Sequence, residues 1–266
     1  MKRLGQNHDG YHGETIDIGR VLADADQAAE RHGWERSEFG QQGEFPLRVL
    51  RRTAAADAPR LYISAGIHGD EPAGPLAALR LLEENDWPAG VAVCLLPCLN
   101  PVGFTLNRRE HTSGRDLNRD YRQPTTPEIR AHTAWLDREA AFDLSLCLHE
   151  DWESHGFYLY EVNLDQRPSV AAAMVSAAAQ VCPIDLHEVI EGRAAKGGII
   201  IPKLTPAERP EWPEAIYLIT HLTRLSYTLE APSDFPLPTR VAALVAATKA
   251  AARHLVTPAP PHRSSL

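Results

Sequence analysis

The fold that we predict for this chain is decided by residues 61–71, LYISAGIHGDE. The first half of this stretch is an apolar run with β-branched and aromatic residues, which predicts a short buried strand. Gly66 and Gly69 interrupt the run, and His68 and Glu71 stand beside them. Imidazole and carboxylate groups both ligate zinc, and open α/β sheets bind ligands beyond the carboxyl ends of their strands. On its own, however, a His-x-x-Glu pattern is more often a surface polar pair than a metal site.

Length and charge restrict the classes of protein to consider. The chain has 266 residues and a formal net charge of −8. This length favours one large α/β domain over 1–266, in which we expect 1–18 and 257–266 to be flexible. The acidic balance, without aromatic residues between basic clusters, argues against nucleic acid as a partner. The oligomeric state stays open.

The sequence shows neither a candidate membrane span nor a signal peptide, and both observations bear on where the protein is located in the cell. No stretch of about 18 apolar residues is present, so we expect no membrane span. The charged residues near the N-terminus are not followed by an apolar segment, so no signal peptide is expected. We therefore predict a cytoplasmic protein. The four cysteines lie in or beside apolar runs and are expected to be reduced, buried thiols.

Strands and helices are predicted to alternate along the chain. Strands are expected at 45–52, 61–65, 91–97, 142–148, 156–162, 199–201 and 225–229. Helices are expected at 19–32, 74–85, 127–139, 168–181, 213–222 and 241–255. This alternation predicts a largely parallel sheet with helices on both faces. An irregular stretch at 104–124 is too long for an ordinary connection, which favours a functional loop.

Three of the predicted strands end in side chains that carry chemistry. One runs into His68 and Glu71, the next into His149, and the last into Glu230. If these strands are parallel, all three ends share one edge of the sheet and their side chains converge. Two imidazoles and one carboxylate leave zinc a position for water, as a catalytic site requires. Glu230 is then a candidate general base, because an apolar strand and a Pro-containing turn flank it.

The loop at 107–121, NRREHTSGRDLNRDY, is rich in arginine. A guanidinium group binds carboxylates in a bidentate way and stabilises an oxyanion, which favours an anionic substrate here. The alternative is a solvated loop whose arginines are neutralised by Glu110, Asp116 and Asp120. The spacing alone does not separate these interpretations. A thiol nucleophile at Cys147, two residues before His149, is a further alternative, although its apolar neighbours favour an inert thiol.

Five elements in order resemble the M14-type zinc carboxypeptidases and their relatives, the murein peptide amidases and the succinylglutamate desuccinylase and aspartoacylase enzymes. The elements are HGDE at 68–71, NPVG at 100–103, GRDLNRDY at 114–121, His149 after a strand, and TLE at 228–230. The resemblance covers about 45–235. It implies a three-layer α/β/α sandwich around a twisted mixed, mostly parallel sheet.

The resemblance also implies roles for individual residues. One Zn²⁺ per chain would be bound by His68, Glu71 and His149, and Glu230 would be the general base and later the proton donor. Arg109 would stabilise the oxyanion, and the adjacent Arg108 could take its place. Asn118 and Arg119 would bind the substrate carboxylate. Asp116 would orient His68.

Two features depart from the family pattern. Carboxypeptidases usually carry a small polar residue after the third ligand, whereas Glu150 and Asp151 follow His149 here. These acids would alter the local charge, bind a second cation or favour a substrate amine. The family tyrosine that covers the substrate has no clear counterpart, because Tyr158, Tyr160 and Tyr217 are all equally well explained by packing.

These observations predict a zinc metallohydrolase of the carboxypeptidase type. It would cleave an amide bond next to a free carboxylate in a small peptide. The alternative substrate is an N-acyl amino acid, which a desuccinylase or aspartoacylase would deacylate. A second alternative, from another class, is a non-catalytic binding protein that keeps the fold.

Overall fold

The computed structural model describes residues 2–8 and 10–256. The helices are α1 (Ile18–Arg31), α2 (Ala73–Glu84), α3 (Pro101–Thr105), α4 (Pro127–Leu136), α5 (Ala171–Ala178), α6 (Glu214–His221) and α7 (Leu237–His254), with short 3₁₀ turns at Leu117–Arg119 and Pro206–Glu208. The strands are β1 (Glu35–Gln42), β2 (Phe45–Arg52), β3 (Arg60–Ala65), β4 (Ala92–Leu96), β5 (Leu144–Asp151), β6 (Tyr158–Asn163), β7 (Val189–Ile190), β8 (Arg193–Lys196), β9 (Ile199–Ile200) and β10 (Leu225–Pro232).

All ten strands form one mixed sheet in the order β1-β2-β4-β3-β5-β10-β6-β9-β8-β7. The four central strands, β4, β3, β5 and β10, are parallel to one another. Strands β2 and β6 pair antiparallel with the two sides of this centre. The predicted mostly parallel sheet is therefore correct only for the centre. Hairpins at both edges make the remaining pairs largely antiparallel, because short loops join antiparallel neighbours.

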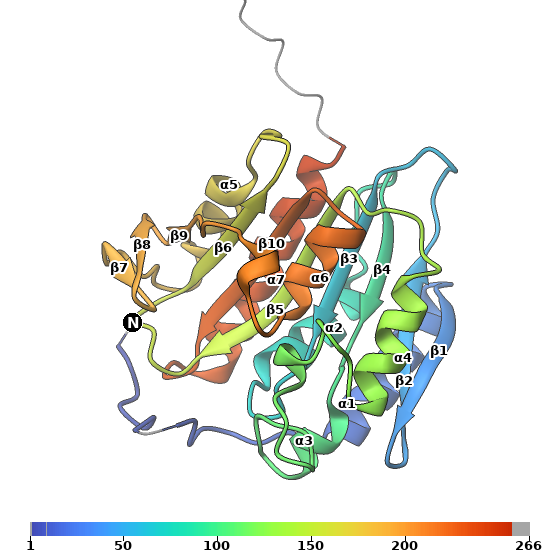
Figure 1. Ribbon diagram of the computed structural model, residues 1–266, viewed down its shortest axis with the longest axis horizontal. Coiled ribbons are helices and arrows are strands. Elements are labelled where there is room, and N and C mark those ends of the chain that lie inside the picture. The colour runs from blue at the N-terminus through green and yellow to red at the C-terminus, as the bar shows by residue number, and fades with distance from the viewer. Residues whose placement is uncertain (1, 9, 257–266) are drawn as a thin grey trace, which may run out of the picture.

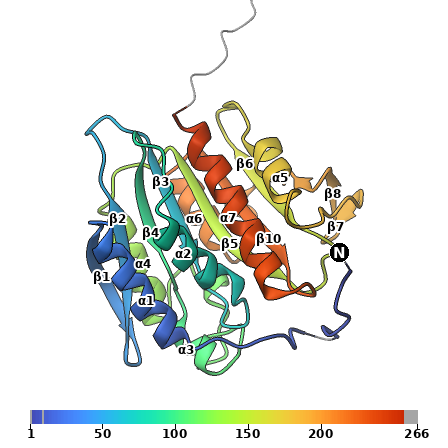
Figure 2. The ribbon, with the colours of Figure 1, turned by 180° about the vertical axis from the view of Figure 1, so that it is seen from behind.

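Helices cover both faces of the sheet. Helices α4 and α6 lie on the face towards the viewer in Figure 1, and α1, α2, α5 and α7 cover the opposite face in Figure 2. The central strands β3 and β5 are buried on both faces along nearly their whole length, and they are rich in apolar residues up to the point where β5 reaches His149. The predicted three-layer α/β/α sandwich is confirmed.

Some elements were not predicted from the sequence. Strand β1 is rich in charged and polar residues, so it shows no apolar alternation, and it pairs only with β2 at the edge of the sheet. Residues 101–105 form the short helix α3. The Asn100 side chain accepts a hydrogen bond from Gly103 N and so begins the helix. The loop region 185–212 contains the hairpin β7–β8 as well as the expected short strand.

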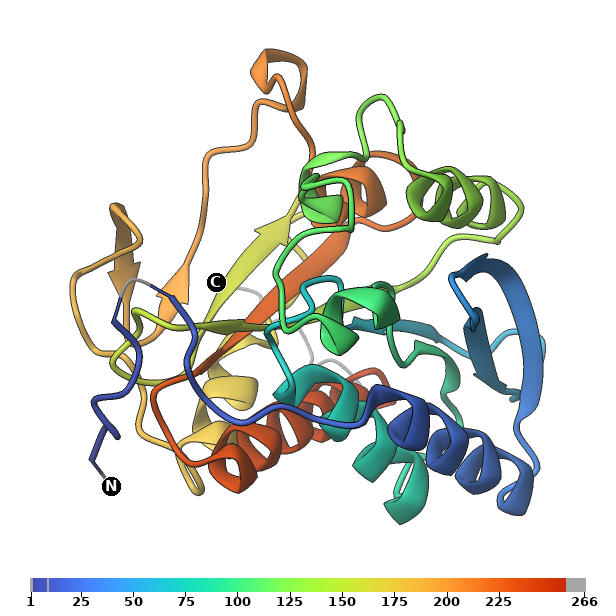
Figure 3. The same ribbon diagram turned by 90° about the horizontal axis from the view of Figure 1, so that it is seen from below.

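Residues 2–8 and 10–16 contain no helix or strand, yet hydrogen bonds hold this segment against the domain. The backbone N–H groups of Gly5 and Gln6 donate to the Asp234 carboxylate, and Leu4 N donates to Asp234 O. Figure 3 shows the segment crossing below α7 and β5 to reach α1. The predicted flexible end at 257–266 lies outside the described residues. Within the described part of the chain, no helix combines the length and the apolar character that a membrane span needs.

Candidate metal centre

The loop between β3 and α2 places His68 and Glu71. Gly66 begins the loop with φ +63°, and a Cβ there would lie 2.9 Å from Cys98 Sγ, so both the conformation and the space favour glycine. Gly69 lies directly against the backbone of the next loop. A Cβ at Gly69 would lie 2.1 Å from Gly103 C and 2.4 Å from Arg108 O. The loop that carries the two candidate ligands therefore packs main chain to main chain against the start of the arginine-rich loop.

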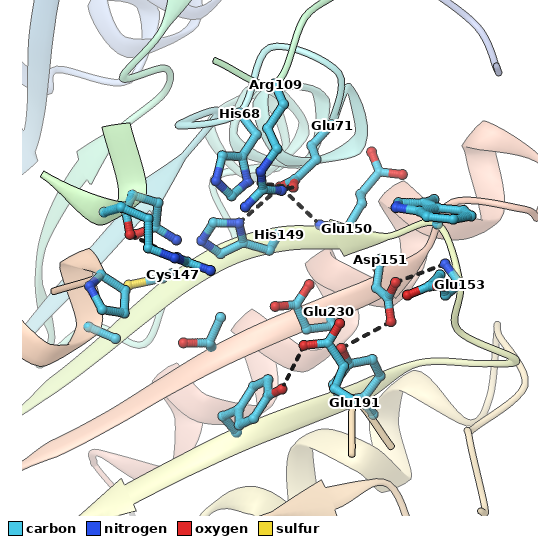
Figure 4. Close-up of a pocket in the computed structure, with 18 of the residues that line it drawn as sticks. His68, Glu71, Arg109, Cys147, His149, Glu150, Asp151, Glu153, Glu191 and Glu230 are labelled. Carbon is cyan, nitrogen blue, oxygen red and sulfur yellow. Dashed lines mark hydrogen bonds and ion pairs between the residues drawn. The ribbon is translucent and has the colours of Figure 1, made fainter. Parts of the chain in front are cut away.

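The structure brings His68, Glu71 and His149 together in one buried group. Their candidate ligand atoms all lie within 4.8 Å of one another. Glu71 is central to the group, because its Oε1 lies 2.5 Å from His68 Nδ1 and its Oε2 lies 2.9 Å from His149 Nδ1. Figure 4 shows the three side chains facing one another from the β3–α2 loop and from β5. His149 reaches this position because β5 is the direct neighbour of β3.

Electrostatics in this group favour an ionised carboxylate. Burial alone would raise the pKa of Glu71, but the imidazoles of His68 and His149 outweigh this effect and hold the pKa well below its ordinary value. The other nitrogen of His68, Nε2, lies 3.2 Å from Asp116 Oδ1. Such a carboxylate contact fixes the orientation of an imidazole and makes it a better metal ligand.

Glu230 lies beside this group on the next strand. It pairs in register with His149, because β10 runs parallel to β5. Directly opposed residues of neighbouring strands project to the same face, so both side chains enter the same cavity. Burial, together with the negative charges of Glu71 and Asp151, raises the pKa of Glu230 well above its ordinary value. A buried carboxyl group with a raised pKa is suited to accept and return a proton near neutral pH.

Arginine and amide groups line the same cavity. Arg109 donates to Asp116 Oδ2 from Nε and Nη2, at 3.2 and 3.0 Å, and its Nη1 lies 3.5 Å from Glu71 Oε1. Asn118 and Arg119 also line the cavity. The structure separates the two adjacent arginines, since Arg108 is exposed and lies outside the residues that line the cavity. This placement favours Arg109 over Arg108.

The cavity has a volume of about 540 Å³, and acidic residues form one of its walls. Asp151 accepts hydrogen bonds from Glu153 N and from Tyr158 Oη, and Glu191 accepts one from Tyr160 Oη. Glu153 and Glu191 were not predicted as site residues. Glu191 belongs to the turn of the β7–β8 hairpin, which the sequence pattern does not reveal. Of the three candidate tyrosines, Tyr158 and Tyr160 line the cavity, whereas Tyr217 donates to Asp137.

A second network that the sequence does not reveal lies behind Asn118. Glu214 N donates to Asn118 Oδ1, and the buried Glu214 carboxylate accepts hydrogen bonds from Tyr62 Oη at 2.6 Å and Ser64 Oγ at 2.8 Å. Burial raises the pKa of Glu214 to about 7. Cys147 is buried next to this network, and burial together with the Glu214 charge raises the pKa of its thiol well above the ordinary value. This environment opposes a thiolate nucleophile.

Comparisons with known proteins agree with this geometry. Residues 57–188 match the family model described as the succinylglutamate desuccinylase/aspartoacylase catalytic domain. A candidate metallopeptidase from Shewanella amazonensis is 27% identical, with a TM-score of 0.79 over 90% of this chain and 93% of that one. The resemblance to the M14-type zinc carboxypeptidase superfamily is confirmed.

Further relatives of this metallocarboxypeptidase-like chain include a second metallopeptidase structure and two carboxypeptidases. A second candidate metallopeptidase, from Shewanella denitrificans, is 26% identical, with a TM-score of 0.78 over 90% of each chain. A metallo-carboxypeptidase from Burkholderia cenocepacia, 18% identical with a TM-score of 0.69 over 91% of this chain and 69% of that one, shares the fold. Carboxypeptidase SOL1 of Arabidopsis thaliana is 32% identical, but the match covers 40% of this chain and only 26% of that protein.

The donor set of this metallocarboxypeptidase-like site fits a zinc ion. His68 Nδ1, His149 Nδ1 and the Glu71 carboxylate supply nitrogen and oxygen ligands of the kinds that catalytic zinc takes, and the cavity leaves their open side accessible. A second cation was predicted at Glu150 or Asp151. Asp151 lies with the exposed Glu153 and Glu191 in a second group of side chains that could hold a metal ion, whereas Glu150 is not favoured by the geometry. The Glu150 carboxylate lies 2.5 Å from the Arg240 guanidinium, so a cation already neutralises it.

Proposed function

We propose that this protein is a zinc-dependent hydrolase that cleaves an amide bond adjacent to a free carboxylate, in the manner of a metallocarboxypeptidase. The observation that carries the proposal is the His68–Glu71–His149 group beside the strand partner Glu230, in a cavity that Arg109 also lines. Ligands, base and anion-binding groups in one cavity are what metal-assisted amide hydrolysis requires.

The proton steps are assigned to Glu230. Zinc, when bound, supplies Lewis-acid polarisation of the carbonyl group and a water of lowered pKa. Glu230 takes a proton from the attacking water and returns it to the leaving amine. Its raised pKa suits both steps, because a base with a pKa closer to neutrality is also an effective acid. Asp151 and Glu71, whose negative charges help to raise this pKa, belong to the neighbouring strand and loop.

Arg109, Asn118 and Arg119 are assigned to the anionic parts of the substrate. Arg109 is held by the Asp116 carboxylate and lies next to Glu71, so it is placed to stabilise the oxyanion that forms at the carbonyl group under attack. Asn118 and Arg119 receive the substrate carboxylate. The Asn118 side chain is already fixed through its Oδ1 by Glu214 N, which leaves its amide nitrogen free to donate to an anion.

A substrate panel on the zinc-loaded protein tests this assignment. Short peptides with a free C-terminal carboxylate are compared with the same peptides carrying a C-terminal amide, and released amino acids are measured. We expect cleavage of the free acids and little cleavage of the amides, together with about one zinc per chain. Stoichiometric zinc without cleavage of any substrate, or a Glu230→Gln variant as active as the wild type, would contradict the proposal and favour a non-catalytic binding protein.

A second candidate function is deacylation of N-acyl amino acids. It is favoured by one observation, the match of residues 57–188 to the succinylglutamate desuccinylase/aspartoacylase catalytic domain. Both reactions break an amide bond with the same groups, so they differ only in what lies on each side of that bond. N-acyl amino acids included in the same panel separate them, since activity restricted to these compounds would replace the peptidase assignment.

A further inference from the structure

Glu150 joins the two chain segments that carry the candidate ligands. It directly follows His149 on β5, and its backbone N–H donates to Glu71 Oε2 at 3.1 Å. Its side chain points the other way, and Oε1 accepts a hydrogen bond of 2.5 Å from Ala73 N at the start of α2. The strand with His149 and the helix that follows Glu71 are therefore fastened to each other through one residue.

A buried carboxylate in this place needs a counter-charge. The Glu150 side chain is 0% exposed and lies next to the negative charge of Glu71, and burial raises its pKa. Arg240, in the first turn of α7, supplies the charge, with Nη1 2.5 Å from Glu150 Oε2. The Arg240 side chain is also 0% exposed, so this ion pair is shielded from water on all sides. Removing Arg240 would leave the Glu150 charge unpaired in the interior.

The N-terminal segment completes the surroundings of Arg240. Tyr11 Oη accepts hydrogen bonds from Nη1 and Nη2 of Arg240 at 3.2 and 3.3 Å, and Glu14 Oε2 accepts one from Nη2 at 2.5 Å. Tyr11 and its neighbour Gly10 also line the cavity. The segment is fixed a second time at Asp234, which precedes the beginning of α7 at Leu237. A stretch without helix or strand thus forms part of the wall of the site.

We propose that Arg240 is a positioning residue for the metal site: through Glu150 it sets the distance between His149 and Glu71, and residues 10–14 hold it in place. The proposal rests on the proposed zinc site. The alternative is an ion pair that stabilises the domain without affecting the site. The two differ in one measurable respect, because a positioning residue changes the affinity for zinc even in a variant that remains as stable as the wild type.

Zinc binding by the full chain is measured in two ways, by competition with a chelator and by the rate of zinc loss. The thermal unfolding temperature of the zinc-free protein is measured in parallel to report stability. The main variant is Arg240→Met with Glu150→Met, which removes both charges and so leaves no unpaired charge buried. We expect its zinc affinity to fall about 10- to 100-fold, the range that loss of groups orienting metal ligands produces. The zinc-free protein should unfold near the wild-type temperature.

Two further variants keep the test decisive. Arg48→Gln breaks the partly buried pair between Arg48 and Asp26, on β2 and α1, away from the site; it should lower the unfolding temperature and leave zinc affinity unchanged. Tyr11→Phe removes one hydroxyl group and keeps the ring, so it should fold. We expect it to raise the rate of zinc loss about 2- to 10-fold, because the two long hydrogen bonds from Arg240 to the hydroxyl group are lost.

The outcomes separate the inference from the proposed function. Wild-type zinc affinity in a folded Arg240→Met, Glu150→Met protein would overturn the inference while leaving the hydrolase assignment intact. If that protein does not fold, Tyr11→Phe decides: an unchanged rate of zinc loss then overturns the inference. A wild-type chain that takes up no zinc would overturn the proposed function, and the inference with it.

Discussion

His149 and Glu230 are register partners on the parallel strands β5 and β10, with 80 residues of chain between them. One pairing thus places a candidate ligand and the candidate base side by side on the same face of the sheet. The relationship depends on the register, because a slip of one residue would turn Glu230 to the opposite face. The base is therefore positioned by regular strand pairing, which is more rigid than a loop.

Glu230→Gln is expected to lower kcat about 10²- to 10⁴-fold, because the amide keeps the shape of the side chain and cannot accept the proton. Zinc content should stay the same, since Glu230 is not among the ligand group. Steady-state kinetics and metal analysis of the purified variant measure both quantities. Glu161→Gln on the neighbouring strand β6, where Glu161 accepts from Ser169, is the matched control and should retain wild-type kcat. Equal losses in the two variants would contradict the role of Glu230.

Arg109→Met and Arg108→Met form a pair that tests the assignment of the oxyanion group. Loss of one oxyanion donor lowers kcat about 10²- to 10³-fold, and we expect this for Arg109. Arg108 is exposed outside the cavity, so its replacement should change kcat by less than about threefold. Kinetic measurements under saturating zinc decide between them, and a larger loss at Arg108 would reverse the assignment.

Asp116→Asn is expected to weaken zinc binding about 10- to 100-fold, because the carboxylate that lies 3.2 Å from His68 Nε2 is lost. A chelator competition titration measures the change. Glu110→Gln, which removes one charge from the same loop, is the control and should leave zinc affinity near the wild-type value. Identical affinities in both variants would mean that Asp116 does not orient His68.

Stability should fall with rising pH through the Glu214 carboxyl group. Burial raises its pKa from 4.5 to about 7 in the folded state. Between these values the unfolded chain releases the proton and the folded chain keeps it, so the free energy of unfolding decreases as pH increases. The full effect of this group is about 3 kcal/mol. It is complete above pH 7 and absent below pH 4.5.

Chemical denaturation of wild type and Glu214→Gln between pH 4 and pH 8 measures this contribution. The glutamine does not titrate, so the difference in unfolding free energy between the two proteins isolates Glu214 from all other groups. The wild type should lose about 3 kcal/mol relative to the variant over this range. A difference that does not vary with pH would show that the buried carboxyl group has an ordinary pKa.

The central strands and the groups at their ends were predictable from the sequence, because strands buried on both faces are rich in apolar residues and the chemical groups follow these apolar runs. The structure places His68, Glu71, His149 and Glu230 together as those runs suggested. Edge strands were not predictable in this way. Strand β1 has polar residues throughout, and its position follows from pairing with β2.

Groups that depend on distant partners were also missed. Arg240 directly precedes the helix predicted at 241–255, and its burial is explained by Glu150, 90 positions away, together with Tyr11 and Glu14. Glu191 reaches the cavity through the β7–β8 hairpin, whose strands are too short to give a pattern. Asp151 and Glu150 were noticed as unusual acids beside His149. Their opposite roles, one lining the acidic wall and the other neutralised by Arg240, follow from the alternation of side chains along β5.

The contact between Gly69 and Gly103 has a consequence for how such a site can change. Because the two backbones touch, no side chain fits at Gly69 without moving one loop away from the other. The contact between their backbones therefore fixes the distance between the loop at 66–71 and the arginine-rich loop. We expect substrate preference in related or engineered sequences to change through insertions after residue 110 or in the β7–β8 hairpin. Residues 66–71 and 100–109 should be replaced only together.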